Sequence, residues 1–397
     1  MCLNNLEYNM DRFLIVLVNE VLSQAELIIA LTKSGIKFQI LEKNETFVIL
    51  DVENKEELTN LGGIYKIGKI ICSSSSVEGI LEKIRKDRKL IMLDDKQQWN
   101  LSYYSDEIIN MDIYEELQNG LASLIKENST KTKFIRNNMK SENFIELSVD
   151  KEKKDAIKIL VGKNKEKYYV AENIISIKSS NFIDRDLSRP YQDSRISLSP
   201  RTARMLVNML GLEKGKTILD PFCGTGTFLI ESIIQGYKVI GVDNRKECVA
   251  GTKKNLLWIM KEQKLNNKIR YVKQDNAEKL STINSLSVDG IVTEPILLPN
   301  FKNNPNFEMA ENELRKSKAV YERSLLAMYR VLNNNGKVCI VTPRIKTRDN
   351  RYITFSFKKM LKKAGFILDD RLNEQPFVMK PSGDQKVLRE IWLLKKS

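Results

Sequence analysis

The stretch Thr217–Thr227, TILDPFCGTGT, combines an apolar run with an acid, a proline and two glycines. Gly224 and Gly226 would let the backbone turn tightly and approach a ligand closely, and the start of a following helix offers free N–H groups. Asp220 adds a negative charge at the end of the apolar run. A Gly-x-Gly pair alone also occurs in ordinary tight turns, so the neighbouring segments must decide between a ligand site and a plain turn.

Two further acids end the next two strand-like segments. Asp243 follows KVIGV, nineteen residues after Gly224, where a carboxylate can accept hydrogen bonds from both hydroxyls of an adenosine ribose. Asp275 ends the strand in YVKQDNA and is expected to accept from the adenine amino group. Ligands of parallel sheets bind beyond the carboxyl ends of the strands, so these acids are expected at one site.

The same segment excludes several classes of ligand. Gly226 is followed by Thr-Phe, which excludes a Walker phosphate loop, and Phe228–Ile230 lack the third glycine of a dinucleotide site. Asp220 would repel a pyrophosphate but suits a cation such as the ammonium of an amino acid. An adenosine joined to an amino acid is S-adenosylmethionine (SAM), which we therefore predict as the cofactor.

The composition restricts the chemistry further. The chain of 397 residues has no histidine, which excludes Ser-His and Cys-His nucleophiles and most transition-metal sites, and we expect no metal. Its five scattered cysteines suggest neither a disulfide framework nor a zinc site. The apolar runs are too short to span a bilayer and no signal-peptide pattern opens the chain, so a cytoplasmic protein without membrane contact is expected.

The net charge of +14 is unevenly distributed. Lys and Arg against Asp and Glu number 14 against 21 in Met1–Thr130, 15 against 10 in Lys131–Leu198 and 36 against 20 in Ser199–Ser397. Positive charge concentrated in one half indicates a polyanionic partner, most simply nucleic acid. A lysine bias spread over solvated faces would give the same count.

The pattern of elements divides the chain into four parts. Residues 1–72 read as a small α+β unit, 73–180 as helices followed by a basic segment and strands, and 181–198 as a linker rich in turn formers. From 199 to 397 strands and helices alternate regularly and end in the hairpin of FILDDRL with VLREIWLL. This alternation predicts an α/β domain with a mostly parallel, doubly wound, seven-stranded sheet. We expect one of its helices to begin at Ser317.

These motifs resemble those of a known family. Asp220–Thr227, Asp243 and Asp275 resemble the class I methyltransferases, and RDLSRPYQDSRISLSPRTARMLVNMLGL before TILDPFCGTGTFLIE is similar to the THUMP-containing tRNA guanosine N2-methyltransferases. Members of that family modify guanosine at position ten of tRNA. The resemblance implies a Rossmann-like methyltransferase domain at 199–397, preceded by a ferredoxin-like subdomain and a THUMP-like RNA-binding domain, whose best match is LSVDKEKKDAIKILVGKNKEKYYVAENI.

The resemblance also implies residue roles. The methionine end of the cofactor would contact Asp220, Phe222, Gly224 and Gly226. The ribose would contact Asp243, the adenine would lie beside Asp275 and Asn276, and the segment containing Ser199 and Pro200 would close over the cofactor.

The fourth strand carries the chemistry. The family reads Asp-Pro-Pro-Tyr at its end, and this chain reads Thr293-Glu294-Pro295-Ile296. Glu294 can replace the Asp as acceptor for an exocyclic amine, with the Pro295 backbone orienting that amine, and these two are the expected catalytic residues. Phe301 in the adjoining loop is expected to supply the missing aromatic platform for a flipped base. A strand end that has lost catalysis is the alternative interpretation.

The sequence therefore predicts a SAM-dependent methyltransferase that acts on an exocyclic amine of tRNA, most simply N2 of a guanosine. Arg344, Lys346 and Arg348 are expected to contact the tRNA. An adenine-N6 or cytosine-N4 DNA methyltransferase and a non-catalytic protein that binds SAM and tRNA are the competing hypotheses. An activating subunit is compatible with each of them.

Overall fold

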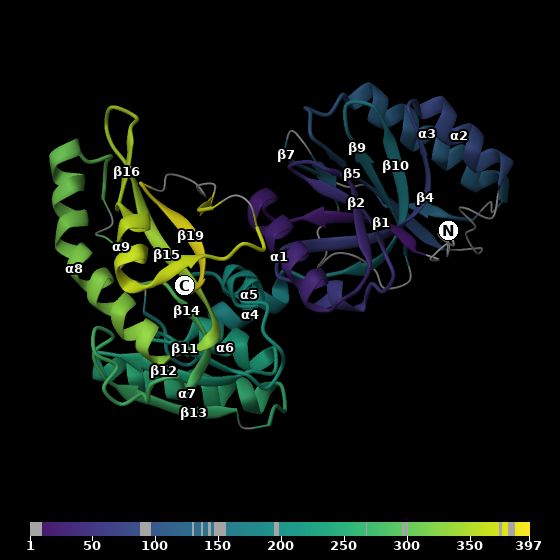
Figure 1. Cartoon of the computed structure of the whole chain (residues 1–397). Coiled ribbons are helices and arrows are strands. Elements are labelled where there is room, and N and C mark those ends of the chain that lie inside the picture. The colour runs from purple at the N-terminus through teal and green to yellow at the C-terminus, as the bar shows by residue number, and fades with distance from the viewer. Residues whose placement is uncertain are drawn as a thin grey trace, which may run out of the picture. The chain divides into compact units, whose positions relative to one another are not determined.

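The computed structural model describes residues 10–87, 97–128, 131–135, 138–141, 144–146, 156–193, 198–266, 268–295, 298, 301–372, 375–379 and 386–397. They form two compact units, the first made of Met1–Gln24 with Ser34–Asn181 and the second of Ala25–Lys33 with Phe182–Ser397. Figure 1 labels helices and strands of both units.

The first unit is built on a sheet in the order β2-β3-β1-β4-β10-β9-β5-β8-β7, with β6 beside β5. Its strands are β1 (Asp11–Leu17), β2 (Phe38–Lys43), β3 (Phe47–Val52), β4 (Ile64–Ser74), β5 (Gln98–Ser105), β6 (Lys133–Phe134), β7 (Asn138–Ser141), β8 (Phe144–Glu146), β9 (Ile157–Lys163) and β10 (Tyr168–Ser176). Helices α2 (Val77–Lys86) and α3 (Met111–Asn128) pack their apolar faces on strands β5, β9 and β10. A 3-10 turn spans Glu56–Asn60, and α1 (Glu20–Lys33) follows β1.

The predicted boundary at residue 72 falls inside β4. This strand pairs with β1 on one side and with β10 on the other. The parts expected at 1–72 and 73–180 therefore share one hydrogen-bonded sheet. Residues 147–155 of the THUMP-like segment lie outside the described residues.

The second unit contains the predicted mostly parallel sheet, which has nine strands among the described residues and not the expected seven, because the sequence does not predict two short strands. Its order is β13-β12-β11-β14-β15-β19-β17, with β16 beside β15 and β18 beside β19. The first five strands of this order run parallel and β19 runs antiparallel to both its neighbours, which confirms the mostly parallel sheet with a terminal antiparallel hairpin. The strands are β11 (Thr217–Asp220), β12 (Lys238–Asp243), β13 (Ile269–Gln274), β14 (Val288–Thr293), β15 (Leu332–Lys346), β16 (Tyr352–Thr354), β17 (Phe366–Leu368), β18 (Phe377–Val378) and β19 (Val387–Lys396).

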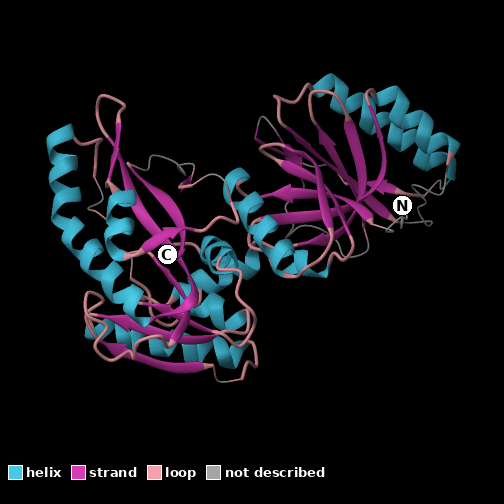
Figure 2. Cartoon of the chain, in the orientation of Figure 1, coloured by secondary structure: helices cyan, strands magenta, loops and turns pink. Residues whose placement is uncertain are grey.

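Helices accompany this sheet, as Figure 2 shows. They are α4 (Ser180–Leu187), α5 (Pro200–Met209), α6 (Thr227–Ile234), α7 (Lys246–Glu262), α8 (Phe307–Val331) and α9 (Phe357–Ala364). Strand β11 is buried along its whole length, as is typical of a strand inside a parallel sheet. None of the helices in the described part of the chain is both long and apolar enough to cross a membrane.

Helix α8 is longer than predicted. It begins at Phe307 and not at Ser317, because Asn306 caps it by accepting the Met309 N–H at 2.8 Å. The first turns of α8 carry many charged residues and little apolar periodicity, so the sequence pattern does not predict them as helical.

The segment predicted as a linker is partly helical. Helix α4 buries Phe182 and Arg185, and its Arg185 Nε donates to Glu231 Oε1 at 2.7 Å. Arg204 of α5 donates to Glu231 Oε2 at 2.8 Å. Glu231 is fully buried on α6, so its charge is compensated by two guanidinium groups. This network ties α4 and α5 to the helix that follows the glycine loop.

Candidate active site

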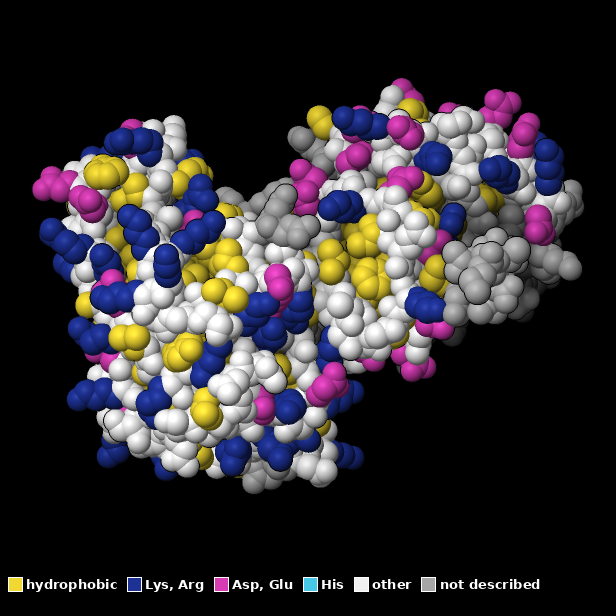
Figure 3. Space-filling view, viewed as in Figure 1, with side chains coloured by type: hydrophobic (Ala, Val, Ile, Leu, Met, Phe, Trp, Pro, Cys, Tyr) yellow, Lys and Arg dark blue, Asp and Glu magenta, His cyan; other side chains and the backbone are white. Residues whose placement is uncertain are grey.

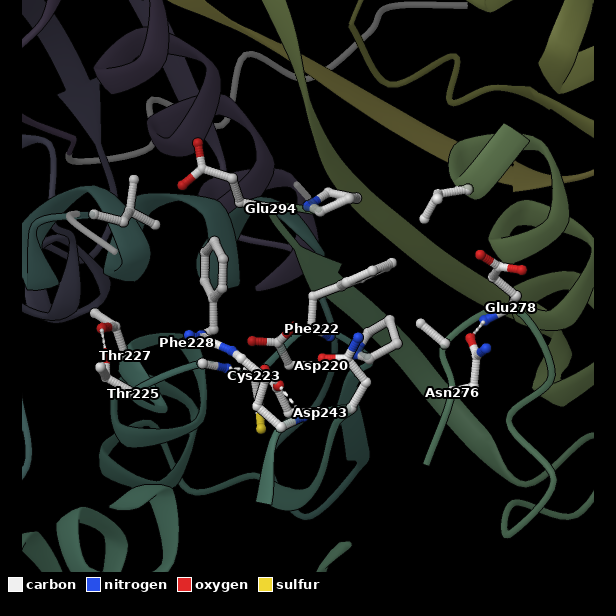
Figure 4. Close-up of a pocket in the computed structure, with 18 residues that line it drawn as sticks. Asp220, Phe222, Cys223, Thr225, Thr227, Phe228, Asp243, Asn276, Glu278 and Glu294 are labelled. Atoms are coloured by element: carbon white, nitrogen blue, oxygen red, sulfur yellow. Dashed lines mark hydrogen bonds and ion pairs between the residues drawn. The ribbon is translucent and has the colours of Figure 1, made fainter. Parts of the chain in front are cut away.

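A pocket of about 410 Å³ opens at the carboxyl ends of β11, β12 and β14. Its volume lies in the range of small-molecule sites. In Figure 4, Glu294 lies at the top of the pocket and Asp243 lies toward its bottom. Asp220 and Phe222 lie between them. Three of the strand-end acids that the sequence singled out, Asp220, Asp243 and Glu294, therefore meet at one place.

Asp220 is the most deeply buried acid of the pocket, at 1% exposure. Its Oδ1 accepts from the Thr293 hydroxyl at 2.8 Å and from the Phe222 N–H at 3.1 Å. Burial raises the pKa of the Asp220 carboxyl to about 7, although both hydrogen bonds oppose this rise. A cation placed beside this carboxylate would be strongly favoured, as expected for an ammonium group.

The glycine loop has the backbone conformation that the sequence predicts. Gly224 and Gly226 have φ of 51° and 84°, in the left-handed region. Helix α7 holds this loop: Thr252 Oγ1 donates to the Gly224 carbonyl at 2.8 Å, and Asn255 Nδ2 donates to the Thr225 carbonyl at 2.9 Å. The loop is thus fixed from behind by two buried polar side chains.

Replacing Gly226 with alanine is expected to lower the free energy of unfolding by about 2 kcal/mol. A Cβ there would lie 2.9 Å from Thr252 Cγ2, in addition to the strain of a positive φ. Gly215→Ala is the matched control, because Gly215 has φ of 86° and open space around a Cβ. Urea unfolding of both variants measures the difference, and equal losses would contradict the predicted clash.

Asp243 ends β12 and is 7% exposed. Its Oδ2 accepts from the Gly224 N–H and its Oδ1 from the Arg245 N–H, each at 2.9 Å. These bonds fix the carboxylate at the pocket, where each oxygen retains a second lone pair. The ribose role of Asp243 stays a prediction.

Asp275 lies differently from the expectation. Its Oδ1 accepts from the Asn276 N–H, and its Oδ2 accepts from the N–H and hydroxyl of Thr282 at 2.8 and 2.9 Å. Burial alone would raise the pKa of Asp275, but these hydrogen bonds outweigh it and the pKa is lowered. The pocket is lined by Asn276, Ala277 and Glu278, and Asp275 is not among its lining residues. The carboxylate caps the turn after β13, so Asn276 is the better placed candidate for the adenine.

The segment before β11 contributes one wall residue, Leu198. Ser199 and Pro200 are not among the lining residues. Ser199 is the N-cap of α5, accepting the Thr202 N–H at 3.1 Å, and Pro200 occupies the first helical turn. Their predicted cofactor contacts stay predictions, while their observed role is to start α5.

Glu294 follows β14 and lines the pocket together with Pro295. Arg389 of β19 donates from Nε to Glu294 Oε1 at 2.6 Å. Burial raises the pKa of the Glu294 carboxyl, and Arg389 opposes that rise. Ile296, which takes the place of an aromatic residue, lies outside the described residues.

The residues predicted to contact tRNA lie around the hairpin of β15 and β16. Arg344 lies over the Tyr352 ring, 4.8 Å from its centroid, and 3.4 Å from Glu390. Lys346 ends β15, and Arg348 is exposed in the following turn.

Phe301 packs, partly buried, against the hydrophobic core and is not among the pocket-lining residues. The pocket's own aromatic side chains are Phe222 and Phe228.

Several pocket residues were not identified from the sequence: Pro221, Cys223, Thr225, Thr227, Phe228, Asn244, Arg245, Ala277, Glu278 and Val320. Most are direct neighbours of the predicted residues in the sequence, so they could have been identified by that adjacency. Val320 comes from the middle of α8 and has no such signal.

Parts of this chain are similar to known proteins. Residues 189–372 match the family model of the RMKL-like methyltransferase domain. The tRNA (guanine(10)-N2)-dimethyltransferase of Methanothermobacter thermautotrophicus is 33% identical over 149 residues, 37% of this chain and 39% of that protein. The protein of the same name from Pyrococcus abyssi is 29% identical over 308 residues, 77% of this chain and 80% of that protein. The chain thus spans under two fifths of the first relative and four fifths of the second.

Among solved structures, the fold is similar to that of TrmN from Thermus thermophilus. The TM-score is 0.58 at 16% sequence identity, and the match covers 97% of this chain and 100% of that one. At this identity the likeness shows a shared fold.

Proposed function

Because residues 189–372 match the family model of the RMKL-like methyltransferase domain, we propose that the protein is a SAM-dependent methyltransferase that modifies N2 of a guanosine in tRNA. The curated relatives that carry the name tRNA (guanine(10)-N2)-dimethyltransferase support the choice of base and substrate. The observation that carries the proposal is the meeting of Asp220 and Glu294, from neighbouring strands, in one pocket.

The residues on the β11 side of this pocket suit the cofactor. Asp220 would hold the ammonium of SAM, the glycine loop would pass beneath its methionine end, and Asn276 lies where the adenine is expected. The donor set fits a cationic ligand, because a buried carboxylate with a raised pKa gains from a positive neighbour. SAM, when bound, supplies an electrophilic methyl group.

Glu294 and Pro295 would prepare the nucleophile. The lone pair of an exocyclic amine is delocalised into the base, so the amine is a weak nucleophile. A carboxylate that accepts from one N–H, with the backbone carbonyl of Pro295 accepting from another, would turn the lone pair toward the methyl group. Glu294 is positioned for this because it follows a central strand and lines the pocket.

The charge of the second unit supports an RNA substrate. Ser199–Ser397 carries 36 Lys and Arg against 20 Asp and Glu, and Figure 3 shows basic side chains spread over the visible face of this unit. Such a surface attracts phosphates without reading sequence. A tRNA substrate also agrees with the cytoplasmic location that the sequence suggests.

Methyl transfer from labelled SAM to bulk tRNA tests the proposed function. Incorporation into tRNA, followed by identification of the product as an N2-methylated guanosine by mass spectrometry of nucleosides, is the expected result. Measurable SAM binding with no incorporation into tRNA would favour the non-catalytic alternative. Incorporation into double-stranded DNA instead would favour a DNA methyltransferase.

The basic turn after β15 gives a second prediction. Lys346→Ala combined with Arg348→Ala is expected to weaken tRNA binding about 10-fold at 0.1 M salt and to reduce its salt dependence, since two phosphate contacts are lost. Lys362→Ala with Lys363→Ala removes the same charge from the exposed face of α9 and serves as control. Filter binding across a salt series measures both, and equal weakening would refute a specific role for the turn.

A further inference from the structure

The ion pair between Glu294 and Arg389 joins two segments that are separated by a strand. Glu294 follows β14 and Arg389 lies on β19, with β15 between them in the sheet. Nε lies 2.6 Å from Oε1 and Nη2 lies 3.5 Å from Oε2, so the guanidinium meets both carboxylate oxygens. The side chains are 9% and 14% exposed. The pair is therefore largely shielded from water at the end of the pocket where the target base is expected.

The surroundings of Glu294 otherwise disfavour its charge. Burial raises its pKa, and the nearest acid on β11 is Asp220, whose own pKa is raised in part by the charge of Glu294. Tyr321 of α8 is the other titratable neighbour, and burial raises its pKa so far that it stays neutral. Arg389 supplies the positive charge that opposes burial at this carboxylate. Removing the guanidinium would shift Glu294 further toward its neutral form.

We propose that Arg389 is a positioning residue that holds Glu294 as an acceptor-only carboxylate against the target base, and that this pair selects guanine. The inference rests on the proposed methyltransferase function and concerns the same pocket. It adds a residue to the site and a physical reason for the choice of base.

The selection of guanine follows from the hydrogen-bond donors and acceptors on the edges of the bases. In guanine the N2 amine adjoins the N1–H, so two neighbouring donors face a ligand. In adenine and cytosine the exocyclic amine adjoins a ring nitrogen that is an acceptor. An ionised carboxylate has no donor, so it matches the guanine edge and repels the lone pair of the other two. Each carboxylate oxygen can accept more than one bond, so Glu294 can bind both Arg389 and guanine.

Arg389→Gln and Arg389→Lys, each in the full-length chain, test the proposal with bulk tRNA and labelled SAM between pH 6 and 9. For Arg389→Gln, kcat is expected to fall at least 10-fold at pH 6.5 and to recover toward pH 9, because the more protonated Glu294 needs higher pH to ionise. Arg389→Lys keeps a cation and should retain most of the wild-type pH profile. The dissociation constant for SAM should change less than threefold in both variants.

Arg371→Gln is the matched control. Arg371 also pairs with a buried carboxylate, Asp369 at 2.7 Å, but Asp369, unlike Glu294, is not among the pocket-lining residues. It should leave the pH profile of kcat unchanged even if stability falls.

The outcomes separate this inference from the proposed function. A wild-type protein that transfers no methyl group to tRNA refutes both. If the wild type methylates guanine but Arg389→Gln keeps the wild-type pH profile, the positioning role is refuted alone. A wild-type product on adenine or cytosine amines overturns the guanine selection, whereas N2-methylated guanosine with a shifted pH profile for Arg389→Gln supports it.

Discussion

Replacing Glu294 with alanine is expected to lower kcat for methyl transfer to tRNA by about 10³-fold, while the dissociation constant for SAM changes by less than threefold. The carboxylate would act on the amine of the base, whereas the residues proposed to bind the methionine end and the ribose of the cofactor, Asp220 and Asp243, lie at the ends of β11 and β12. Single-turnover transfer measures the rate, and calorimetric titration with SAM measures binding. Retained SAM binding also shows that the variant is folded.

Glu313→Ala is a suitable control for this experiment. Glu313 lies on α8 and pairs with Lys316 at 2.5 Å, and it is not among the pocket-lining residues. It should leave both kcat and SAM binding unchanged. If Glu294→Ala keeps more than a tenth of the wild-type kcat, Glu294 is not the acceptor for the amine, and the proposed role of the fourth-strand motif fails.

Replacing Asp220 with asparagine is expected to have opposite effects on binding and on stability. SAM binding should weaken about 100-fold, because a buried charge next to the ammonium is lost. The protein without cofactor should gain about 2 kcal/mol in free energy of unfolding at pH 8, because the asparagine carries no charge to bury. Its Oδ1 can still accept from Thr293 and from the Phe222 N–H, so the hydrogen bonds survive.

The pH dependence of that gain follows from the raised pKa of Asp220, about 7 in the folded protein. Between about pH 4 and pH 7 the folded protein keeps a proton on Asp220 that the unfolded chain has lost. This group's contribution to the free energy of unfolding therefore falls as pH rises through that window. The Asp220→Asn variant lacks this titration, so its advantage should be near zero at pH 4 and complete above pH 7.

Urea unfolding of wild type and Asp220→Asn across this pH range provides the measurement. Asp289→Asn is the control, because Asp289 also accepts a backbone N–H from β11, at 2.8 Å, but is not among the pocket-lining residues. A loss of stability for Asp220→Asn at pH 8 would contradict the assigned burial cost, and unchanged SAM affinity would contradict the proposed ammonium contact.

The sequence predicts the second unit well because its information is local. Most strands and helices from Thr217 onward are predicted by their own periodicity, and the strand-end acids follow from where strands stop. The glycine loop is equally local, since two glycines separated by one residue allow its positive φ angles. Where the prediction failed within this unit, as at the start of α8, a capping side chain extended a helix into a stretch without apolar periodicity.

The contacts that hold the site together are not local and could not be predicted. Arg389 reaches Glu294 from 95 residues away along the chain. Thr252 and Asn255 hold the glycine loop from α7, the second helix after it, and nothing in their types distinguishes them from other polar helix residues. Such partners become visible only once the sheet order is known. Asp275 is a different case: its carboxylate accepts from Thr282 only seven residues later, but a contact within a loop follows no helix or strand periodicity.

The passage of β4 across residue 72 affects how this protein can be divided. A fragment that ends at residue 72 would retain β1 and its pairing with β4, but β4 would lose its last residues and its partner β10. The unpaired N–H and C=O groups along that edge would be open to intermolecular strand pairing, which is a common origin of insoluble fragments. A fragment that is expressed to study the N-terminal half should therefore include all of residues 10–181.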